Sequence, residues 1–373
     1  MRLVVPLVLD RLYLLLFVYL AVQLLPPIFA ADTYRANLHW PPGEPPSILT
    51  AFKTWDSHHY LWLSERGYQP GAISNAFYPL WPTLIRLASP LFLGNRLAAT
   101  LILSNLLSVL GLLAFHRFVD EQHGEEIGDL APLLLVAYPG ALFFAFPYTE
   151  SLFFLLTVLF FFVLYRRDYF SAALVSFFLP LTRFVGVFVG VPFFQDVYRS
   201  WKERRQVQLG DLAYLIAPAL GMATYFVIMV VSTGNPLGGI DAQKYFIGRR
   251  SLSNLVDLPG LVRSFVDVEP GHRPLNSFHD RLWFVAFLLA LFKVWRLDRR
   301  YFWFSVLLGL FPVMTGTFWS FTRFLVVVFP VFIAGADILS RQRWKALKRP
   351  IIGALFSIQI LFFIRHINNY WAG

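Results

Sequence analysis

Residues 151–167 read SLFFLLTVLFFFVLYRR, and this stretch decides the fold class. No charged residue interrupts its apolar part, and Arg166 and Arg167 follow directly. Apolar runs that end in basic residues are typical of helices that cross a membrane. The rest of the chain has the same character, because 57% of its 373 residues are hydrophobic and only 14% are charged. A soluble domain carries about 25% charged residues, so we expect an all-α polytopic membrane protein.

The net charge of +10 arises mainly from basic residues between the apolar segments. This distribution indicates membrane topology and argues against a nucleic-acid-binding surface. Cysteine is absent, which excludes disulfides, thiolate nucleophiles and thiolate metal ligands. The first apolar segment has no small-residue cleavage site, so we expect it to be a retained helix.

The apolar segments predict about eleven spans that form a single domain over 1–373. The predicted spans are 12–30, 97–118, 130–146, 151–165, 169–181, 184–198, 212–231, 282–293, 301–314, 324–339 and 351–364. Two long outer loops are expected at 31–96 and 232–281. The first of these contains a short helix at 57–67 that is expected to lie on the membrane surface.

Segment 78–93 is apolar enough to cross the membrane, but it contains three prolines and Arg86. An arginine in the middle of a span is costly. If this segment lies along the outer interface, all the strongly basic short loops face the cytoplasm, as the positive-inside rule requires. These loops are 166–167, 199–205, 293–300 and 341–349. The N-terminus is then inside and the C-terminus outside.

The same topology predicts that several polar clusters share the outer side of the membrane. They are the opening loop and the segments 147–151, 181–184, 232–280 and 320–324. We therefore look for a functional site among their side chains.

Asp56 in the opening loop is the first candidate for catalysis. Its neighbours are Trp55, His58, His59 and Tyr60. A carboxylate there can act as general base toward a hydroxyl, while the aromatic groups exclude water and stack on a sugar ring. Alternatively, Asp56 only caps the following helix, since aspartate is a favoured N-cap. The rival carboxylates in this loop are Asp32, Glu44 and Glu65.

Glu150 lies between two very apolar segments, where an ionisable group is expensive unless it faces a cavity or a partner. Tyr148 and Ser151 would line the same pocket. The alternative is an acidic residue that interacts with the dipole of the following helix.

Arg183 and Arg323 each occur in the sequence Thr-Arg-Phe within apolar surroundings. The planar fork of arginine suits phosphate oxygens, so two such residues predict a site for a phosphate-bearing lipid. The alternative is a structural role in salt bridges, such as one between Arg183 and Glu150. Further candidate cations are Lys244, Arg249 and Arg250, which alternatively extend to the lipid headgroups.

Metal and nucleotide chemistry find little support in the sequence. Adjacent histidines point in different directions on a helix, so His58 and His59 cannot easily share one ion, and no HExxH spacing occurs. GxxxxGK[ST] is absent, and so is a GxGxxG within a soluble strand–helix unit. We therefore expect no metal or other cofactor.

Several motifs together resemble the bacterial relatives of PIG-V, the GPI mannosyltransferase II family. They are Trp55-Asp56, His59-Tyr60, Gly67-Tyr68, Phe77-Tyr78-Pro79-Leu80-Trp81-Pro82, Tyr148-Thr149-Glu150-Ser151-Leu152-Phe153, Thr182-Arg183 with Gly186, Gly234-Asn235-Pro236-Leu237 and Ala242-Gln243. Tyr78 and Trp81 replace commoner aromatic residues, and Thr149 stands where serine is frequent. None of these differences removes a functional group.

The resemblance implies an integral-membrane glycosyltransferase of the GT-C class without a cofactor. Such an enzyme transfers mannose from a polyprenyl-phosphate carrier to an acceptor hydroxyl, with inversion at the anomeric carbon. The catalytic acid of the first outer loop corresponds to Asp56. The resemblance also suggests a bacterial cytoplasmic membrane, and the topology from the basic loops places the active site on its extracytoplasmic face. The acceptor stays open among a glycolipid, which we favour, a polyprenyl-linked glycan and a protein hydroxyl.

The remaining assignments are our own inference from the residues. We assign the donor phosphate to Arg183, Arg323, Lys244 and His58. We assign substrate contacts to Trp55, His59, Tyr60, Tyr78, Tyr148, Glu150 and Ser151. Two other classes of function stay open, namely a lipid or sugar flippase that performs no chemistry and a scaffold subunit of a membrane complex.

Overall fold

The computed structural model describes residues 31–373 except 46, 48, 205–208, 247–251 and 269–276. Regular structure in this part of the chain is entirely helical, and its only β-type pairing is an isolated bridge between His39 and Thr54. The predicted span at 12–30 lies outside the described residues. The all-α prediction is confirmed for the rest of the chain.

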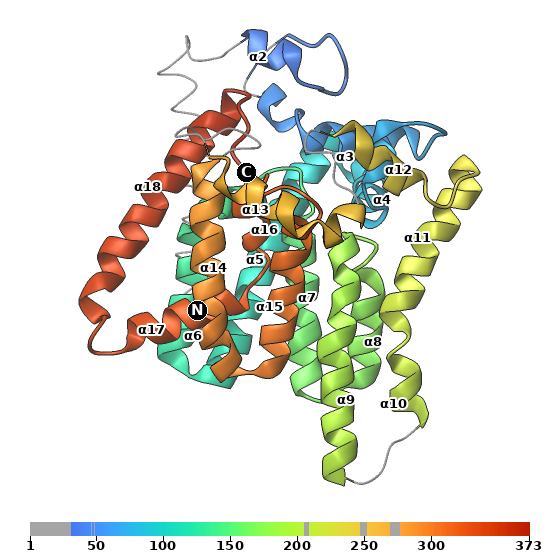
Figure 1. Ribbon diagram of the computed structural model, residues 1–373. Coiled ribbons are helices and arrows are strands. Elements are labelled where there is room, and N and C mark those ends of the chain that lie inside the picture. The colour runs from blue at the N-terminus through green and yellow to red at the C-terminus, as the bar shows by residue number, and fades with distance from the viewer. Residues whose placement is uncertain (1–30, 46, 48, 205–208, 247–251, 269–276) are drawn as a thin grey trace.

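The elements follow one another with short connections (Figure 1). The α-helices are α2 (Ala31–Ala36), α3 (Asp56–Arg66), α4 (Leu80–Ala88), α5 (Arg96–His123), α6 (Glu125–Ala137), α7 (Glu150–Tyr165), α8 (Tyr169–Phe178), α9 (Gly190–Arg204), α10 (Leu209–Tyr214), α11 (Ala217–Thr233), α12 (Gly238–Ala242), α13 (Leu258–Val266), α14 (Phe278–Leu297), α15 (Arg299–Met314), α16 (Phe321–Leu325), α17 (Pro330–Ser340) and α18 (Lys348–Ile367). The 3₁₀ helices are η2 (Leu49–Phe52), η3 (Ile73–Ala76), η4 (Ser89–Phe92), η5 (Pro139–Phe144), η6 (Phe184–Val189), η7 (Gln243–Tyr245), η8 (Leu252–Val256) and η9 (Lys345–Leu347).

The long helices form a bundle in which neighbours in sequence usually pack side by side (Figure 1). Helix α5 packs against α6 and α7, α7 against α8, and α14 against α15 and α17. Small residues allow the closest contacts. A Cβ atom on Gly111 of α5 would lie 2.9 Å from Phe154 Cδ1 of α7, so glycine permits this approach.

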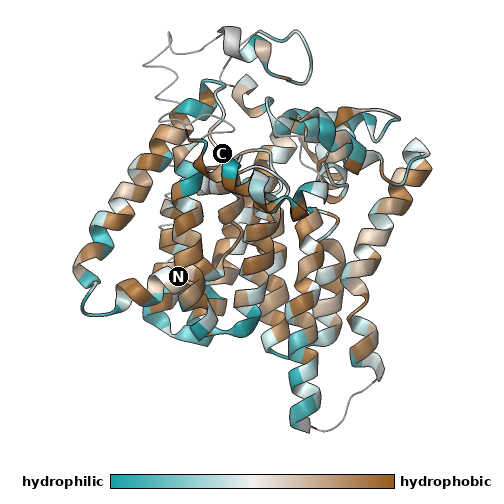
Figure 2. Cartoon of the chain, viewed as in Figure 1, coloured by the Kyte–Doolittle hydropathy of each residue, from teal (hydrophilic) through white to brown (hydrophobic). Residues whose placement is uncertain are grey.

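Three helical segments in the described residues are long and apolar enough to cross a membrane, namely Arg96–His123, Gly210–Thr233 and Lys345–Ile367. Shorter apolar helices are Glu150–Tyr165, Tyr169–Phe178 and Pro330–Ser340. Hydrophobic residues dominate the middle of the bundle, and hydrophilic residues gather at its two ends (Figure 2). This pattern is that of an integral membrane protein, although a count of eleven spans is not confirmed.

Four predicted spans are not single continuous helices, and the one at 212–231 is divided between α10, which ends at Tyr214, and α11, which begins at Ala217. The segment predicted at 130–146 is helical only to Ala137, because Tyr138 precedes Pro139 and has an extended backbone. The segment predicted at 324–339 divides into α16 and α17, and α17 begins at Pro330. The segment predicted at 184–198 starts with η6 before α9 begins at Gly190. Hydropathy alone does not detect such breaks.

Segment 78–93 forms α4 and η4, which together present two different surfaces. Trp81 and Ile85 are fully buried, whereas Arg86, Leu87 and Leu91 are exposed. A short helix with one apolar exposed edge and a basic residue is typical of a membrane interface. The predicted interfacial position fits this surface and stays a prediction.

The basic loops meet at one end of the bundle through ion pairs between different connections. Arg166 Nη2 lies 2.9 Å from Glu121 Oε2, and Arg167 Nη2 lies 2.7 Å from Glu203 Oε2. Asp337 pairs with Lys293 at 2.6 Å and with Arg341 at 3.0 Å. These contacts bring together the loops that the positive-inside rule assigned to one side.

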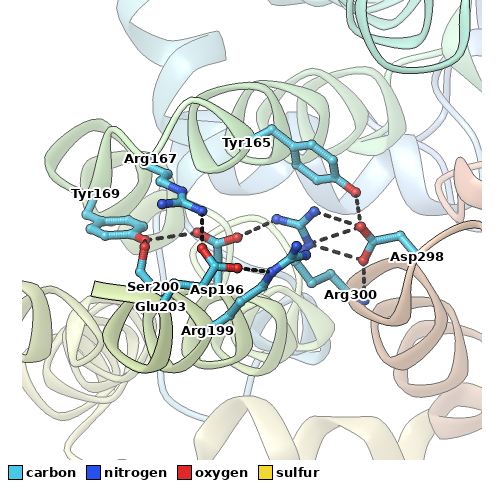
Figure 3. Close-up of polar contacts among 9 residues, drawn as sticks. All are labelled: Tyr165, Arg167, Tyr169, Asp196, Arg199, Ser200, Glu203, Asp298 and Arg300. Atoms are coloured by element: carbon cyan, nitrogen blue, oxygen red, sulfur yellow. Dashed lines mark hydrogen bonds and ion pairs between the residues drawn. The ribbon is translucent and has the colours of Figure 1, made fainter. Parts of the chain in front are cut away.

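Arg300 is the centre of a polar network at this end (Figure 3). Its guanidinium donates to Asp298 Oδ2 at 2.7 Å, pairs with Asp196 and lies 3.8 Å above the ring of Tyr165. Tyr165 donates to Asp298 at 2.7 Å, and Tyr169 donates to Asp196 at 3.0 Å. The network therefore joins α7, α8, α9 and α15.

Replacing Arg300 with methionine should destabilise the bundle strongly. The substitution leaves the buried carboxylate of Asp196 and the partly buried one of Asp298 without their shared cation, and breaking a buried pair costs about 3–5 kcal/mol. The measurement is the apparent midpoint of thermal unfolding in detergent. Arg199→Met is the matched control, because the side chain of Arg199 is 65% exposed and should contribute little. Equal effects of the two variants would show that the Arg300 network does not hold the helices together.

Candidate active site

Asp56 is the first residue of α3 and is held at the opposite end of the bundle from Arg300. The preceding residue, Trp55, has a φ of 57°, a value that is uncommon outside glycine and turns the chain sharply into the helix. Helix α3 ends before Gly67, whose φ is 71°. Asp56 thus occupies the first turn of a helix, where the backbone dipole favours a negative charge.

Glu150, Arg183 and Arg323 converge on Asp56 from three other parts of the chain. Glu150 Oε1 accepts a hydrogen bond from Arg183 Nη1 at 2.6 Å and another from Arg323 Nε at 2.5 Å. Arg323 Nη1 donates to Asp56 Oδ2. We name these four residues the carboxylate–arginine cluster. The sequence motifs predicted its members, and the structure brings all of them into one network.

Exposure increases stepwise across the cluster. The side chain of Glu150 is fully buried, that of Arg323 is 4% exposed, that of Arg183 is 16% exposed and that of Asp56 is 25% exposed. The formal charges of two acids and two arginines cancel, which reduces the cost of burying them. Substrates can therefore reach Asp56 and Arg183 more readily than Glu150.

Glu150 pairs with Arg183 and Arg323 and is not placed to bind substrate. Its carboxylate is fully buried at the start of α7, and its Oε2 has no hydrogen-bond partner. The salt bridge to Arg183 was the structural alternative considered for these residues, and it is present. Ser151 is also committed elsewhere, because its hydroxyl is buried and donates to the backbone oxygen of Phe144 at 2.9 Å.

Aromatic rings enclose the guanidinium of Arg323. Its Cζ lies 4.4 Å from the ring centre of Tyr148, 5.1 Å from that of Phe143 and 5.7 Å from that of Trp371. Cations are stabilised over such rings, and more strongly where water is excluded. Tyr148 was predicted at the site. Trp371 was missed, because nothing in its local sequence relates it to Asp56.

Trp55 and Tyr60 complete the surroundings of the cluster. The ring of Trp55 packs against Trp371 with ring centres 5.1 Å apart. The hydroxyl of Tyr60 lies 3.4 Å from Thr149 Oγ1, next to Glu150 in the chain. These contacts connect α3 to the start of α7.

Asp280 is a second residue that the sequence did not single out. It lies in α14, and its Oδ1 accepts hydrogen bonds from Thr322, the residue before Arg323. Only its position in a polar outer loop could have drawn attention to it.

His59 is buried and His58 is partly buried, and both lie close to Asp56 in sequence without joining the cluster. Burial lowers the pKa of His58, and it lowers the pKa of His59 well below its ordinary value, with a further effect from His58. His59 Nδ1 lies 2.9 Å from Ser74 Oγ, and its ring stacks on Phe77. The prediction that His58 supplies a cation for phosphate is not supported, because its neutral form is favoured.

Two further predicted residues lie apart from the cluster in the recorded contacts. Lys244 is exposed and packs over the ring of the adjacent Tyr245. Tyr78 packs against Tyr225 of α11, with ring centres 4.6 Å apart. Arg249 and Arg250 lie outside the described residues. In the part of the chain that the structure describes, no three histidine or carboxylate side chains gather as a metal site requires.

Two similar solved structures are of the oligosaccharyltransferase of Archaeoglobus fulgidus, one in the apo form and one in complex with an inhibitory peptide and a dolichol-phosphate. Their TM-scores are 0.45 and 0.48, with 13% sequence identity over 97% of this chain and 56% of theirs. The chain therefore spans just over half of their length, and scores of this size do not establish a shared fold.

The comparison with protein families is more informative than the comparison with structures. A search of curated proteins finds no match. A family model described as Mannosyltransferase (PIG-V) matches residues 12–220, which are 209 of the 373 residues. This region includes Asp56, Glu150 and Arg183. Because the match extends over more than half of the chain, the protein belongs to the mannosyltransferase (PIG-V) family.

Proposed function

We propose that this glycosyltransferase moves mannose from a polyprenyl-phosphate carrier to the hydroxyl of a glycolipid acceptor, with Asp56 as general base. The observation that carries the proposal is the shared arginine. Arg323 pairs at once with a partly exposed carboxylate, Asp56, and with a buried one, Glu150. A base and a cation for the leaving group are thus held side by side.

In the proposed step, the acceptor oxygen attacks the anomeric carbon while its proton moves to Asp56. The bond between the anomeric carbon and the phosphate oxygen breaks, and the electron pair leaves with the polyprenyl phosphate. The sugar is transferred with inversion, because attack and departure occur on opposite faces. A lipid phosphate is a stable leaving group, so the step needs no general acid.

Charge balance gives Arg323 a role in both halves of this step. Transfer of the proton neutralises Asp56, and at the same time the leaving phosphate gains a negative charge. The positive charge of Arg323 then no longer faces a charged Asp56, so it can stabilise the leaving phosphate. The net charge of the enclosed site stays constant, which avoids creating an unpaired charge away from water.

Arg183 is the better candidate to bind the donor before reaction. It is more exposed than Arg323, and its recorded hydrogen bond uses only Nη1. The remaining fork of nitrogens is suited to phosphate oxygens. Glu150 would then orient both arginines, because its Oε1 accepts from each of them.

The arrangement of charges supports an extracytoplasmic site in a cellular membrane. The basic loops lie together at the end of the bundle that carries Arg300, whereas the carboxylate–arginine cluster lies at the other end. By the positive-inside rule, the end that carries Arg300 faces the cytoplasm. A carrier with its phosphate in the outer leaflet would meet the cluster directly.

Changing Asp56 to asparagine should abolish mannose transfer and leave the protein folded. The amide keeps the shape of the carboxylate but cannot take the proton, and loss of general base catalysis costs about 10²–10⁴-fold in rate. The measurement is transfer of radiolabelled mannose from a polyprenyl-phosphate-mannose donor in proteoliposomes.

The matched control is Glu65→Gln, which alters a carboxylate of the same helix that pairs with Arg66 and Arg96 outside the cluster. It should keep most of the activity. A fully active Asp56→Asn variant would rule out the base role. Labelled donor that crosses the membrane unchanged would instead favour the flippase.

Arg183→Met should weaken binding of the donor more than it slows catalysis. A hydrogen bond to a charged group contributes about 1.5–3 kcal/mol, so the KM for the donor should rise by roughly tenfold to a hundredfold. The measurement is initial rate against donor concentration. Arg86→Met, at an exposed position on α4, is the control. An unchanged KM in the Arg183 variant would place the phosphate elsewhere.

The protein should lose stability as the pH falls below about 6.5, in part through His59. Because burial holds the pKa of His59 well below its ordinary value, only the unfolded chain takes up this proton at mildly acidic pH. The contribution of His59 to the free energy of unfolding is therefore complete above the pKa of His59 in the unfolded chain. It is lost as the pH falls toward the pKa of His59 in the folded protein. The apparent thermal midpoint of His59→Gln should decline less between pH 7.5 and pH 5.5 than that of the wild type. His116→Gln, which alters a less buried histidine, should follow the wild type.

A further inference from the structure

We propose that Asp280 is a positioning residue for the transfer reaction, because it holds the segment from which Arg323 extends. This inference rests on the proposed function of the carboxylate–arginine cluster. The hydrogen bonds of the Asp280 side chain go to Thr322 and not to any of the four cluster residues. It acts through Thr322, the residue that precedes Arg323 in α16.

The geometry of the contact is well defined. Asp280 Oδ1 accepts a hydrogen bond from Thr322 N at 2.8 Å and a second one from Thr322 Oγ1 at 2.7 Å. Both side chains are fully buried. Two bonds to one oxygen fix the position and the orientation of Thr322. Because Arg323 is the next residue in the chain, the position of its Cα is fixed as well.

The segment needs such a support because it is not in a relaxed conformation. Ser320, just before α16, has a φ of 68°, a left-handed value that costs energy for a residue other than glycine. Helix α16 has only five residues, so it has little hydrogen bonding of its own. Contacts from neighbouring elements must therefore hold it.

A second element confines Thr322 from another side. A Cβ atom on Gly140 of η5 would lie only 2.4 Å from the backbone oxygen of Thr322. The backbone of η5 thus packs directly on this residue. Thr322 is held between Gly140 and Asp280, and any shift of Thr322 would move both ion pairs of Arg323 together.

The ordinary structural roles of an acidic residue do not account for Asp280. Ser277 already caps α14, since its hydroxyl accepts from Asp280 N at 3.3 Å. The adjacent Arg281 donates to backbone oxygens of Ser277 and Ser264. Asp280 is a buried carboxylate whose Oδ1 binds Thr322, while its Oδ2 makes no side-chain hydrogen bond. Burying a charge is expensive. What the buried carboxylate of Asp280 contributes to the structure is its contact with Thr322.

The test compares two substitutions of Asp280 of similar size. Asp280→Leu removes the acceptor, and kcat should fall by about tenfold to a hundredfold while the KM for the donor changes by less than about threefold. Asp280→Asn keeps an oxygen that accepts from Thr322, and it should retain most of the wild-type kcat. The amount of folded protein is measured in parallel by size-exclusion chromatography and thermal unfolding.

A double-mutant cycle with Arg323→Lys shows whether the effect passes through Arg323. Once Arg323 no longer makes its two directed contacts, Asp280→Leu should cost little further activity. Equal losses in both backgrounds, or an Asp280→Asn variant as slow as Asp280→Leu, would overturn the inference.

If Asp280→Leu does not fold, Thr322→Val replaces it, because valine removes one of the two hydrogen bonds and keeps the shape of the side chain. An intermediate loss of kcat that disappears in the Arg323→Lys background supports the inference, and an unchanged kcat contradicts it. The cycle reports on coupling to Arg323 alone. A failure of the base role of Asp56 would therefore be recognised separately, in the Asp56→Asn variant.

Discussion

The end of the bundle that carries the carboxylate–arginine cluster depends on one buried cation, Arg323, which two carboxylates share. Without Glu150 and Asp56, a guanidinium this deeply enclosed would be too costly to bury. Without Arg323, the same would hold for Glu150. The three charges therefore require one another, and they bring together α3, α7 and α16. Arg183 extends the network toward a more exposed position.

Several parts of this arrangement could be predicted from the sequence. Basic residues in short loops are a local signal of topology, and two of the loops that they assigned to one side, 166–167 and 199–205, are joined by the ion pair of Arg167 and Glu203. Arginine and glutamate are rare in apolar surroundings, so Glu150, Arg183 and Arg323 stood out individually. Their mutual pairing could not be derived in the same way, since it depends on how distant helices pack.

Other features could not be predicted from the sequence because they too depend on how distant parts of the chain pack. Trp371 and Asp280 occur in unremarkable local patterns, and their roles come from contacts with residues far along the chain. Hydropathy overestimated the continuity of several spans. In two of them it does not register the backbone restrictions at Pro139 and Pro330. The histidine pair drew attention by its residue type, whereas in the structure His59 stacks on Phe77 and His58 packs edge-on against His59.

The length of α7 determines how deep in the bilayer the chemistry would take place. The helix has 16 residues, so it rises about 24 Å from the network around Arg300 to the carboxylate–arginine cluster. The hydrocarbon core of a bilayer is about 30 Å thick. In the topology proposed above, with the basic end at the cytoplasmic boundary, the cluster would lie a few ångströms below the outer layer of headgroups. Water-soluble acceptors would have to descend to that level, whereas the hydroxyl of a membrane-anchored glycolipid is already close to it.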